Sequence, residues 1–555
     1  MGLTDHETLT CDVLVVGGGG AGLRAAIAAR QAGTDVLLVS KTQIANTTNT
    51  YFSKAVIAAP GLGDSADSGA VHITDTVEGG CHLNDRQMVA RVAEGAGAEV
   101  AFLEKCGVRF GMDAGKIRVL GIPGHSFPRH IHGENWVGRD LVLPLKSKAQ
   151  QLGVRMMAHL FVSRLLVDSG RIGGAAAIAT DGRFMVLQAK TVILATGGYA
   201  RIFLNTNNAP GITGDGQALA FNAGLPLMDM EFVQFYPTAL GTRGNRLLLY
   251  ERLLTQPRAA LIDPDGEDIL GRHGIADPSK VTRDQLARIL MSEISNGGGQ
   301  EQVIRMDLSQ IPDDTARQLA QLLPPRWFRG EKVFAVAPTA HFCMGGIVTD
   351  PDGQTALPGL FAAGEAAAGV HGANRLGGNA LAEIFTMGAV AGRKAAELAG
   401  TLASPAVAGE AVSEEKNRLI QLFQTDGERP RRLIQDLQAL MWKRVGIIRR
   451  AEELAAALRQ IEGTWPEMAV CSPGDLIRRL EFENMRLVAR LVCRAALERT
   501  ESRGSHFRED HPTENNSDWL QNIIQTKAAG EVASHLRKAV GDEAVTGERD
   551  AGSGR

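Results

Sequence analysis

The spacing of apolar residues divides the chain into regions of different character. From about residue 413 onward, apolar side chains recur every three or four positions, as at Leu433, Leu437 and Met441, which predicts a helical region. Other segments are short, mostly apolar and followed by glycine or charged residues, which predicts buried strands of an α/β sheet. These segments cover residues 11–16, 35–39, 191–196 and 359–363.

The order of these segments predicts the domain organisation. Because the strand over 359–363 follows the first three only after a long interval, we predict a Rossmann-like α/β nucleotide-binding domain in two parts, 1–227 and 341–408. Residues 228–340 have fewer glycine turns and helical charge spacing, so we expect an inserted α+β capping domain there. We expect a helical C-terminal domain over 409–527. Residues 528–555 are charged, glycine-dotted and poor in aromatics, which predicts a flexible tail.

The turn after the first strand carries a nucleotide-binding signature. Gly17, Gly19 and Gly22 fit the G-x-G-x-x-G spacing, with a strand before them and an alanine-rich helical stretch after them. Gly17 permits the tight turn, Gly19 lets backbone N–H groups approach a pyrophosphate, and Gly22 lets helix and strand pack closely. The acid that usually ends the second strand and binds a ribose is replaced by Ser40 and Lys41, which weakens the simple NAD interpretation.

Composition excludes several classes of function. The chain has 555 residues with 62 acidic and 59 basic side chains, a net charge of −3 that gives no reason to expect a nucleic-acid partner. Its six cysteines include no C-x-x-C pair, so the sequence predicts neither a zinc site nor an iron–sulfur cluster within this chain. We therefore expect no bound metal. No signal peptide and no long apolar run is evident, so we expect a cytoplasmic protein with no direct membrane span, either free or peripheral to the membrane through partner subunits.

Eight strings, read in order, resemble one family. The chain is similar to the flavoprotein subunits of succinate dehydrogenase and fumarate reductase, with L-aspartate oxidase as a near relative, over residues 11–520. The resemblance implies FAD, a cap domain over the flavin, and hydride exchange with a carbon next to a carboxylate. The strings are DVLVVGGGGAGLRAA, ATGGYAR, TGDGQALAFNAG, DMEFVQFYPT, TRDQLARILMSEI, PTAHFCMGGI, GLFAAGEAAAGVHGANRLGGNAL and ESRGSHFREDHP.

The resemblance also implies roles for three catalytic residues. Arg375 matches the arginine that clamps the substrate carboxylate, and a guanidinium fork is suited to bidentate carboxylate binding. His341 matches a second donor to that carboxylate. Arg283 matches the cap-domain arginine that donates or accepts the proton, and Arg288 on the same predicted helix competes for that role. The alternatives are a structural salt bridge for Arg375, a buried hydrogen-bonded histidine for His341 and a surface ion pair for Arg283.

The cofactor residues that the resemblance implies are spread over the two parts of the nucleotide domain. Glu365 matches an acid that contacts flavin-side hydroxyls, and Asp215 lies by the phosphate–ribityl region, although Asp215 could instead cap the helix that it precedes. Residues 379–381 are expected at the pyrimidine end of the flavin. The full expected set is Gly17, Gly19, Gly20, Ala21, Gly22, Ser40, Lys41, Thr48, Ala195, Thr196, Gly197, Asp215, Glu365, Asn379, Ala380 and Leu381.

Three departures from the family pattern change the expected chemistry. Thr48 stands where the respiratory enzymes carry the histidine that binds flavin covalently, so we expect non-covalent FAD. Lys54 replaces a small residue and either lies near the flavin or points to solvent. Tyr236 and the pair Tyr250-Glu251 replace a histidine and a Thr-Glu pair at the distal carboxylate. Because a phenol is bulky and uncharged, a substituted or monocarboxylate enoate becomes a candidate substrate beside fumarate or succinate.

Three functions remain open on the sequence. The first is the catalytic flavoprotein subunit of a succinate dehydrogenase or fumarate reductase-like complex, which passes electrons to a separate iron–sulfur subunit. Basic residues at Lys443, Arg444, Arg449 and Arg450 could face an acidic partner or form a solvated helix face. The second is a self-contained flavin oxidase like L-aspartate oxidase. The third is a non-catalytic flavoprotein that only relays electrons.

Overall fold

The computed structural model describes residues 3, 7–242, 247–249, 253–254, 256, 258–278, 281–296, 303–320, 323–403 and 407–539. Its largest sheet has seven strands in the order β7-β2-β1-β10-β9-β8, with β17 also paired to β10. Strands β1, β2, β7, β10 and β17 pair in parallel, and β8 and β9 join antiparallel. Their bounds are β1 Glu7–Val16, β2 Val36–Ser40, β7 Arg155–Ala158, β8 Leu160–Asp168, β9 Arg171–Ala179, β10 Phe184–Leu194 and β17 Leu360–Ala362.

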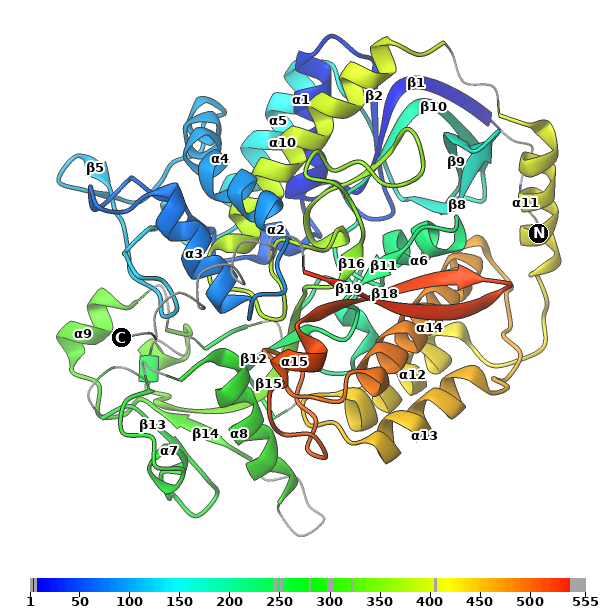
Figure 1. Cartoon of the computed structure of the whole chain (residues 1–555). Coiled ribbons are helices and arrows are strands. Elements are labelled where there is room, and N and C mark those ends of the chain that lie inside the picture. The colour runs from blue at the N-terminus through cyan, green and yellow to red at the C-terminus, as the bar shows by residue number, and fades with distance from the viewer. Residues whose placement is uncertain are drawn as a thin grey trace, which may run out of the picture.

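Helices from both halves of the chain cover this sheet (Figure 1). The long α10 (Asn379–Gly400) packs along α1 (Gly20–Gln31), so the segment after β17 returns to the first βαβ unit. Both helices are rich in alanine, which allows their axes to approach closely and form a continuous buried core with the central strands. The other helices of this part are α2 Asn49–Phe52, α3 Gly69–Gly79, α4 Arg86–Lys105, α5 Arg139–Gln151 and α6 Asp215–Asn222.

Short elements complete this region. Two small antiparallel pairs join β3 (Val56–Ala58) to β6 (His130–His132) and β4 (Met112–Asp113) to β5 (Lys116–Ile117). Single turns of 3₁₀ helix cover Ala200–Ile202, Trp327–Arg329 and Gly364–Ala366. Among the described residues, no helix combines the length and apolarity needed to cross a bilayer.

A second sheet lies apart from the first, in green at the lower left of Figure 1. Its four antiparallel strands run in the order β12-β15-β14-β13 and have a hydrophobic core of their own. Helix α8 packs against β12 and begins with a reciprocal capping box between Thr282 and Gln285. The elements are β12 Val233–Leu240, β13 Ala260–Ile262, β14 Arg305–Asp307, β15 Val333–Cys343, α7 Ile269–Arg272, α8 Arg283–Ser295 and α9 Asp313–Gln318.

The C-terminal part is helical as far as residue 498. Helices α12 (Pro430–Val445), α13 (Ala451–Glu462) and α14 (Pro473–Glu498) pack together, and α14 contacts α6. Helix α11 (Gly409–Gln421) packs against β8 of the first sheet, and α15 covers Asn516–Trp519. The predicted basic face is wrong for Arg449, which is fully buried and bonds to the Glu231 carbonyl. Arg444 pairs with Glu453, and Arg450 pairs with Glu509. These guanidinium groups therefore bind their own chain.

The expectation of a flexible tail from residue 528 is wrong for its first part. Strand β19 (Glu531–Lys538) pairs along its whole length with β18 (Gln521–Ala528). The pair continues through β11 (Leu227–Met228) to β16 (Gly346–Ile347), which gives a four-stranded sheet of segments distant in sequence. Charge and low aromatic content predicted disorder, but backbone hydrogen bonds to β18 order the segment. Residues 540–555 lie outside the described part of the chain.

Candidate active site

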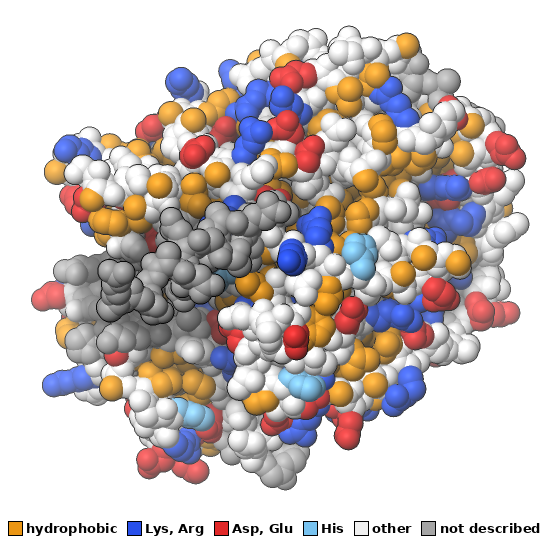
Figure 2. Space-filling model, in the orientation of Figure 1, with side chains coloured by type: hydrophobic (Ala, Val, Ile, Leu, Met, Phe, Trp, Pro, Cys, Tyr) orange, Lys and Arg blue, Asp and Glu red, His pale blue; other side chains and the backbone are white. Residues whose placement is uncertain are grey.

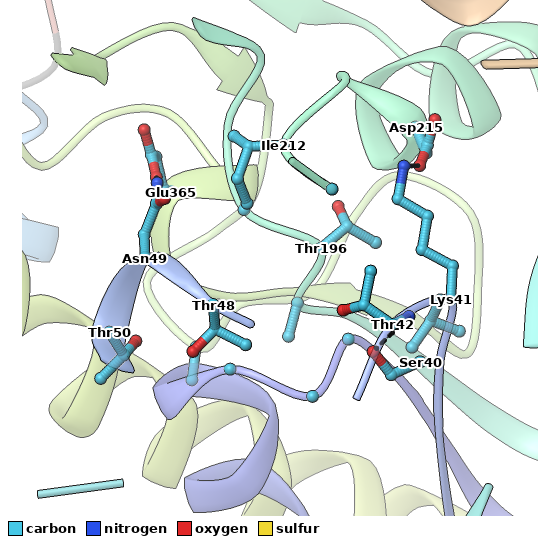
Figure 3. Close-up of a pocket in the computed structure, with 18 of the residues that line it drawn as sticks. Ser40, Lys41, Thr42, Thr48, Asn49, Thr50, Thr196, Ile212, Asp215 and Glu365 are labelled. Atoms are coloured by element: carbon cyan, nitrogen blue, oxygen red, sulfur yellow. Dashed lines mark hydrogen bonds and ion pairs between the residues drawn. The ribbon is translucent and has the colours of Figure 1, made fainter. Parts of the chain in front are cut away.

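A cavity opens at the carboxyl ends of β1, β2 and β10, where the glycine turn meets the loops after Ser40 and Leu194 (Figure 3). It encloses about 870 Å³, including its open mouth, which is the size of a cofactor pocket. Twelve of the sixteen expected cofactor residues line it: Gly17, Gly19, Gly20, Ala21, Ser40, Lys41, Thr48, Ala195, Thr196, Gly197, Asp215 and Glu365. The other four, Gly22, Asn379, Ala380 and Leu381, are not in its wall.

The glycine turn is shaped for close approach. Gly17 has φ +124°, and a Cβ there would lie 2.1 Å from the Ala195 carbonyl oxygen. A Cβ on Gly22 would lie 1.9 Å from the Gly17 carbonyl oxygen, so Gly22 acts in helix–strand packing rather than in the cavity wall. At Gly19, by contrast, the nearest atom to such a Cβ is 3.8 Å away. The N-terminus of α1 thus faces open space, which suits an anionic pyrophosphate.

Lys41 lines the edge of the cavity and forms ion pairs with two carboxylates of its own chain. Its Nζ lies 2.6 Å from Asp215 and 2.7 Å from Glu481 on α14, and Figure 3 shows it directed at Asp215. Burial opposes the charge, but the two carboxylates outweigh burial and raise the pKa of Lys41. Lys41 therefore ties the nucleotide sheet to the C-terminal helices. Asp215 is the first residue of α6 and accepts a hydrogen bond from Thr213 as well.

The loop after β2 supplies Thr48, which was predicted, and four further polar residues that were not. Thr48 is the N-cap of α2 and its hydroxyl accepts from the Tyr51 N–H, while Thr42, Thr47, Asn49 and Thr50 also line the cavity. The polar run over 46–50, shortly after a buried strand, is a signal that could have identified them. Lys54, just beyond, is half-buried and outside the cavity wall, and burial lowers its pKa.

Glu365 is a buried acid at the opposite wall. Its carboxylate accepts from the Cys343 N–H at 3.1 Å and from Asn49 at 3.4 Å. Burial dominates over these bonds and raises the pKa of Glu365 to about 7. Glu365 can therefore change its protonation state near neutral pH.

Residues 379–381 form the start of α10. Gly378, at φ +80°, is the N-cap, and Asn379 bonds to His72 at 2.8 Å and to Thr76 at 3.0 Å. The Asn379 side chain thus binds the protein rather than pointing into the cavity. Any ligand contact from this segment would come from backbone groups of the helix start.

The second part of the site surrounds Arg375. Arg375 is 6% exposed; its guanidinium donates to Gln234 at 2.8 Å and lies 4.7 Å from the centroid of the Phe342 ring. Gln234 on β12 also donates to the Arg375 carbonyl at 2.9 Å, so it holds both the backbone and the side chain. Gln234 was not predicted as a site residue, although it stands two positions before Tyr236.

Three more predicted residues meet beside Arg375. Tyr236 on β12 packs edge-on against His341 on β15, with ring centroids 5.4 Å apart. The guanidinium carbon of Arg283 on α8 lies 5.0 Å from the Tyr236 ring centroid. Burial and the positive charges of Arg375 and Arg283 lower the pKa of His341 well below its ordinary value. His341 is therefore neutral, with both cations close enough to act on it.

The competing arginine on α8 points elsewhere. Arg288 lies 4.8 Å from the centroid of the Phe507 ring and 3.7 Å from Asp284, away from Tyr236. Burial raises the pKa of Asp284, whose carboxylate also accepts from Asn374, the residue before Arg375. The geometry favours Arg283 as the cation at the site. Tyr250 and Glu251, the remaining predicted substrate residues, lie outside the described residues.

Comparison with known proteins agrees with this geometry. Residues 12–381 match the FAD binding domain family and residues 434–545 match the fumarate reductase flavoprotein C-terminal family. The fold and the cavity thus define an FAD-dependent oxidoreductase. The chain belongs to the succinate dehydrogenase and fumarate reductase flavoprotein family, whose members act on CH–CH bonds.

Individual relatives match nearly the whole chain. One subunit of the fumarate reductase (CoM/CoB) of Methanothermobacter marburgensis is 34% identical over 539 residues, covering 94% of this chain and 98% of the relative. L-aspartate oxidase of Mycobacterium bovis is 34% identical over 516 residues, covering 90% and 92%. Among solved structures, E. coli quinol fumarate reductase FrdA matches with a TM-score of 0.87 and 28% identity, covering 96% and 97%.

Proposed function

We propose that this chain reduces an enoate, or oxidises the corresponding saturated acid, with Arg375 and His341 holding the carboxylate and Arg283 handling the proton. One observation carries the proposal. Arg283, Tyr236, His341 and Arg375 come from four separate segments: Arg283 and His341 both pack against the Tyr236 ring, and Arg375 is close enough for its charge to lower the pKa of His341. Two cations and a neutral imidazole around one point form a receptor for a carboxylate next to a reacting carbon.

Each residue then has a defined task. Arg375, fixed by Gln234, provides two N–H groups to the carboxylate, and His341 donates a further hydrogen bond. The cation of Arg283 rests on the Tyr236 ring and carries the proton for the neighbouring carbon. Because an arginine has a pKa above 12, it transfers protons only if other groups replenish it. FAD, when bound, would exchange the hydride.

The finer domain description belongs to the same proposal. We propose that the seven-stranded sheet is the Rossmann-like FAD domain and that residues 228–340 form its cap. The separate core around the second sheet supports this division, as does the position of α8, which carries Arg283. Strand β15 runs from Val333 to Cys343, so the cap sheet itself delivers His341.

We propose that FAD is held non-covalently. The glycine cradle, the cavity volume and the free space at Gly19 fit a dinucleotide, and Thr48 has no nucleophilic nitrogen for a flavin bond. Acid precipitation should therefore release all of the flavin into the supernatant. Yellow colour that stays in the washed pellet would contradict this proposal.

The substrate we propose is a substituted or monocarboxylate enoate, with fumarate as the alternative. The observation that supports it is Tyr236, a bulky, buried and uncharged side chain at the position where the family binds the distal carboxylate of a dicarboxylate. Anaerobic reoxidation of the reduced enzyme by fumarate and by β-substituted acrylates would decide between the two. Faster reoxidation by fumarate would favour the dicarboxylate.

We propose that the electron partner is a separate iron–sulfur subunit. The first relative above is named as one subunit of its enzyme, and the described residues hold no group of three potential metal ligands. On the face drawn in Figure 2, acidic and basic side chains are interspersed. The likeness to L-aspartate oxidase supports a second candidate, a stand-alone oxidase. Rapid oxygen consumption by the isolated chain would favour that candidate.

The central experiment compares arginine variants. Arg375→Gln and Arg283→Gln should each slow enoate-dependent reoxidation by at least about a hundredfold while FAD content is kept. Arg288→Gln, on the same helix but against Phe507, is the matched control and should behave as wild type. Unchanged turnover in both Arg375→Gln and Arg283→Gln would show a chain that only relays electrons.

A further inference from the structure

An asparagine that the sequence argument did not identify contacts the substrate-side histidine. The amide nitrogen of Asn207 lies 3.0 Å from Nδ1 of His341, and its amide oxygen lies 3.3 Å from the same atom. Which of the two faces the ring decides the position of the imidazole proton. An amide N–H makes Nδ1 an acceptor, whereas an amide oxygen would require a proton on Nδ1.

A chain of hydrogen-bonded amide side chains, beginning at Asn49, fixes which atom of Asn207 faces His341. The backbone N–H of Ala209 donates to the Asn49 oxygen at 2.9 Å, so the Asn49 nitrogen must point the other way. That nitrogen donates to the oxygen of Asn208 at 2.6 Å. Since backbone groups have fixed donor and acceptor roles, the orientation of Asn49 is set, and it sets that of Asn208.

The orientation of Asn208 then determines that of Asn207. The Asn208 nitrogen faces the His341 carbonyl at 2.8 Å, which can only accept, and it also donates to the Asn207 oxygen at 3.2 Å. Because the Asn207 oxygen faces the Asn208 nitrogen, the Asn207 amide cannot be flipped, and its nitrogen, which at 3.0 Å is the nearer of its two polar atoms, donates to Nδ1. Asn208 is 2% exposed, so water does not compete for these bonds.

We infer that Asn207 is a positioning residue that holds His341 as the neutral tautomer with its proton on Nε2. The inference rests on the proposed function, since it supplies the donor that His341 needs for the substrate carboxylate. The groups facing His341 are Arg375 and Arg283, both cations, and Tyr236. Neither arginine can accept a proton from the ring. The hydrogen bond from the Asn207 amide to Nδ1 therefore favours the tautomer with its proton on Nε2.

The same chain reaches the cofactor cavity. The Asn49 nitrogen also lies 3.4 Å from the Glu365 carboxylate, and both residues line the cavity. One hydrogen-bonded path thus joins the wall of the flavin cavity to the imidazole at the substrate site. Figure 3 shows Asn49 beside Glu365.

The test is Asn207→Asp in the holoenzyme. A carboxylate only accepts, so it would draw the proton of neutral His341 to Nδ1 and leave a bare Nε2 toward the substrate. We expect the KM for the enoate to rise about tenfold or more at high pH and to recover as pH falls, when the ring becomes doubly protonated. In wild type, KM should not rise at high pH. Asn46→Asp, the same change at an exposed position, should match wild type.

Nitrogen NMR of the protein labelled with [¹⁵N]histidine reads the tautomer without turnover. The His341 signals, assigned by their loss in His341→Gln, should show a bare Nδ1 and a protonated Nε2 in wild type. Asn207→Asp should reverse them at high pH, and Asn207→Ala should give a mixture. A proton on Nδ1 in wild type, or the same tautomer in Asn207→Asp, would overturn the inference. If the tautomer is as expected but His341→Gln and Arg375→Gln leave KM unchanged, the proposed function fails instead.

Discussion

The guanidinium carbon of Arg283 lies 5.0 Å from the centroid of the Tyr236 ring, so the phenol ring supports the cation for which we propose a role at the substrate. A cation–π contact of this kind is worth about 0.5 to 2 kcal/mol. Tyr236→Phe keeps the ring face and should retain most of the rate, whereas Tyr236→Leu should slow enoate-dependent reoxidation of the reduced enzyme about tenfold.

The two variants separate ring from hydroxyl. Stopped-flow rates at saturating enoate report the chemical step, and FAD absorbance confirms that each variant is loaded. Equal losses in Tyr236→Phe and Tyr236→Leu would mean that the hydroxyl, not the ring face, matters to Arg283.

The contact between Gly22 and Gly17 gives a second prediction. Gly22→Ala would place a Cβ 1.9 Å from a backbone oxygen, so the turn must shift. We expect a loss of about 1 to 3 kcal/mol in the free energy of unfolding and a much weaker hold on FAD. Urea denaturation and flavin titration measure the two effects.

Gly97 in α4 provides the matched control. A Cβ there meets no atom within 4 Å, so Gly97→Ala should leave FAD binding unchanged and stabilise the helix by about 0.5 to 1 kcal/mol. Similar FAD affinities for the Gly22 and Gly97 variants would show that the turn tolerates a side chain.

Lys41 holds two partly buried carboxylates together, and its removal should be felt in both domains. Lys41→Met leaves Asp215 and Glu481 side by side without a cation, which should lower the free energy of unfolding by about 2 to 3 kcal/mol. FAD affinity should fall too, because Asp215 lines the cavity.

A second, more exposed lysine tests whether burial is the reason for the large loss of stability expected in Lys41→Met. Lys190 pairs with Asp12 at 2.8 Å in a more exposed position, so Lys190→Met should change stability by less than about 1 kcal/mol. Chemical denaturation of both variants in the same buffer gives the comparison. Equal losses of stability in Lys41→Met and Lys190→Met would show that burial of the ion pair does not determine its contribution.

Glu365 predicts a pH dependence. Burial raises its pKa from 4.5 to about 7, so the folded chain keeps a proton that the unfolded chain releases as pH rises between these values. Across this window, flavin-free wild type should lose up to about 3 kcal/mol of stability relative to Glu365→Gln, with no further change above it.

Urea denaturation at pH 5 and pH 8 measures this difference. Glu104→Gln, at an exposed site on α4, should follow wild type at both values. If the gap between wild type and Glu365→Gln were the same at pH 5 and pH 8, Glu365 would have to be ionised in the folded chain throughout.

The nucleotide-binding half was predictable because its signals are local. Strand, glycine turn and helix follow one another within residues 11–33, so the glycine part of the cavity wall followed from the local pattern, while the rest of its predicted wall came from the resemblance. The resemblance supplied Arg375, His341 and Arg283 as candidates. It left Arg283 and Arg288 unresolved, because both stand on one helix and only the packing of α8 on β12 decides which one meets Tyr236.

Sequence alone thus determined the class of domain, the cofactor and the kinds of side chain at the site. Tertiary structure decided the rest: Gln234 beneath Arg375, the amides from Asn49 to Asn207 behind His341, and the order of β19 against β18. The side-chain hydrogen bonds join residues far apart in the chain, and β19, which follows β18 across a short turn, is anchored because β18 pairs with the distant β11. Local periodicity cannot encode such partners, because an amide or an edge strand has no preferred partner until the fold brings one within reach.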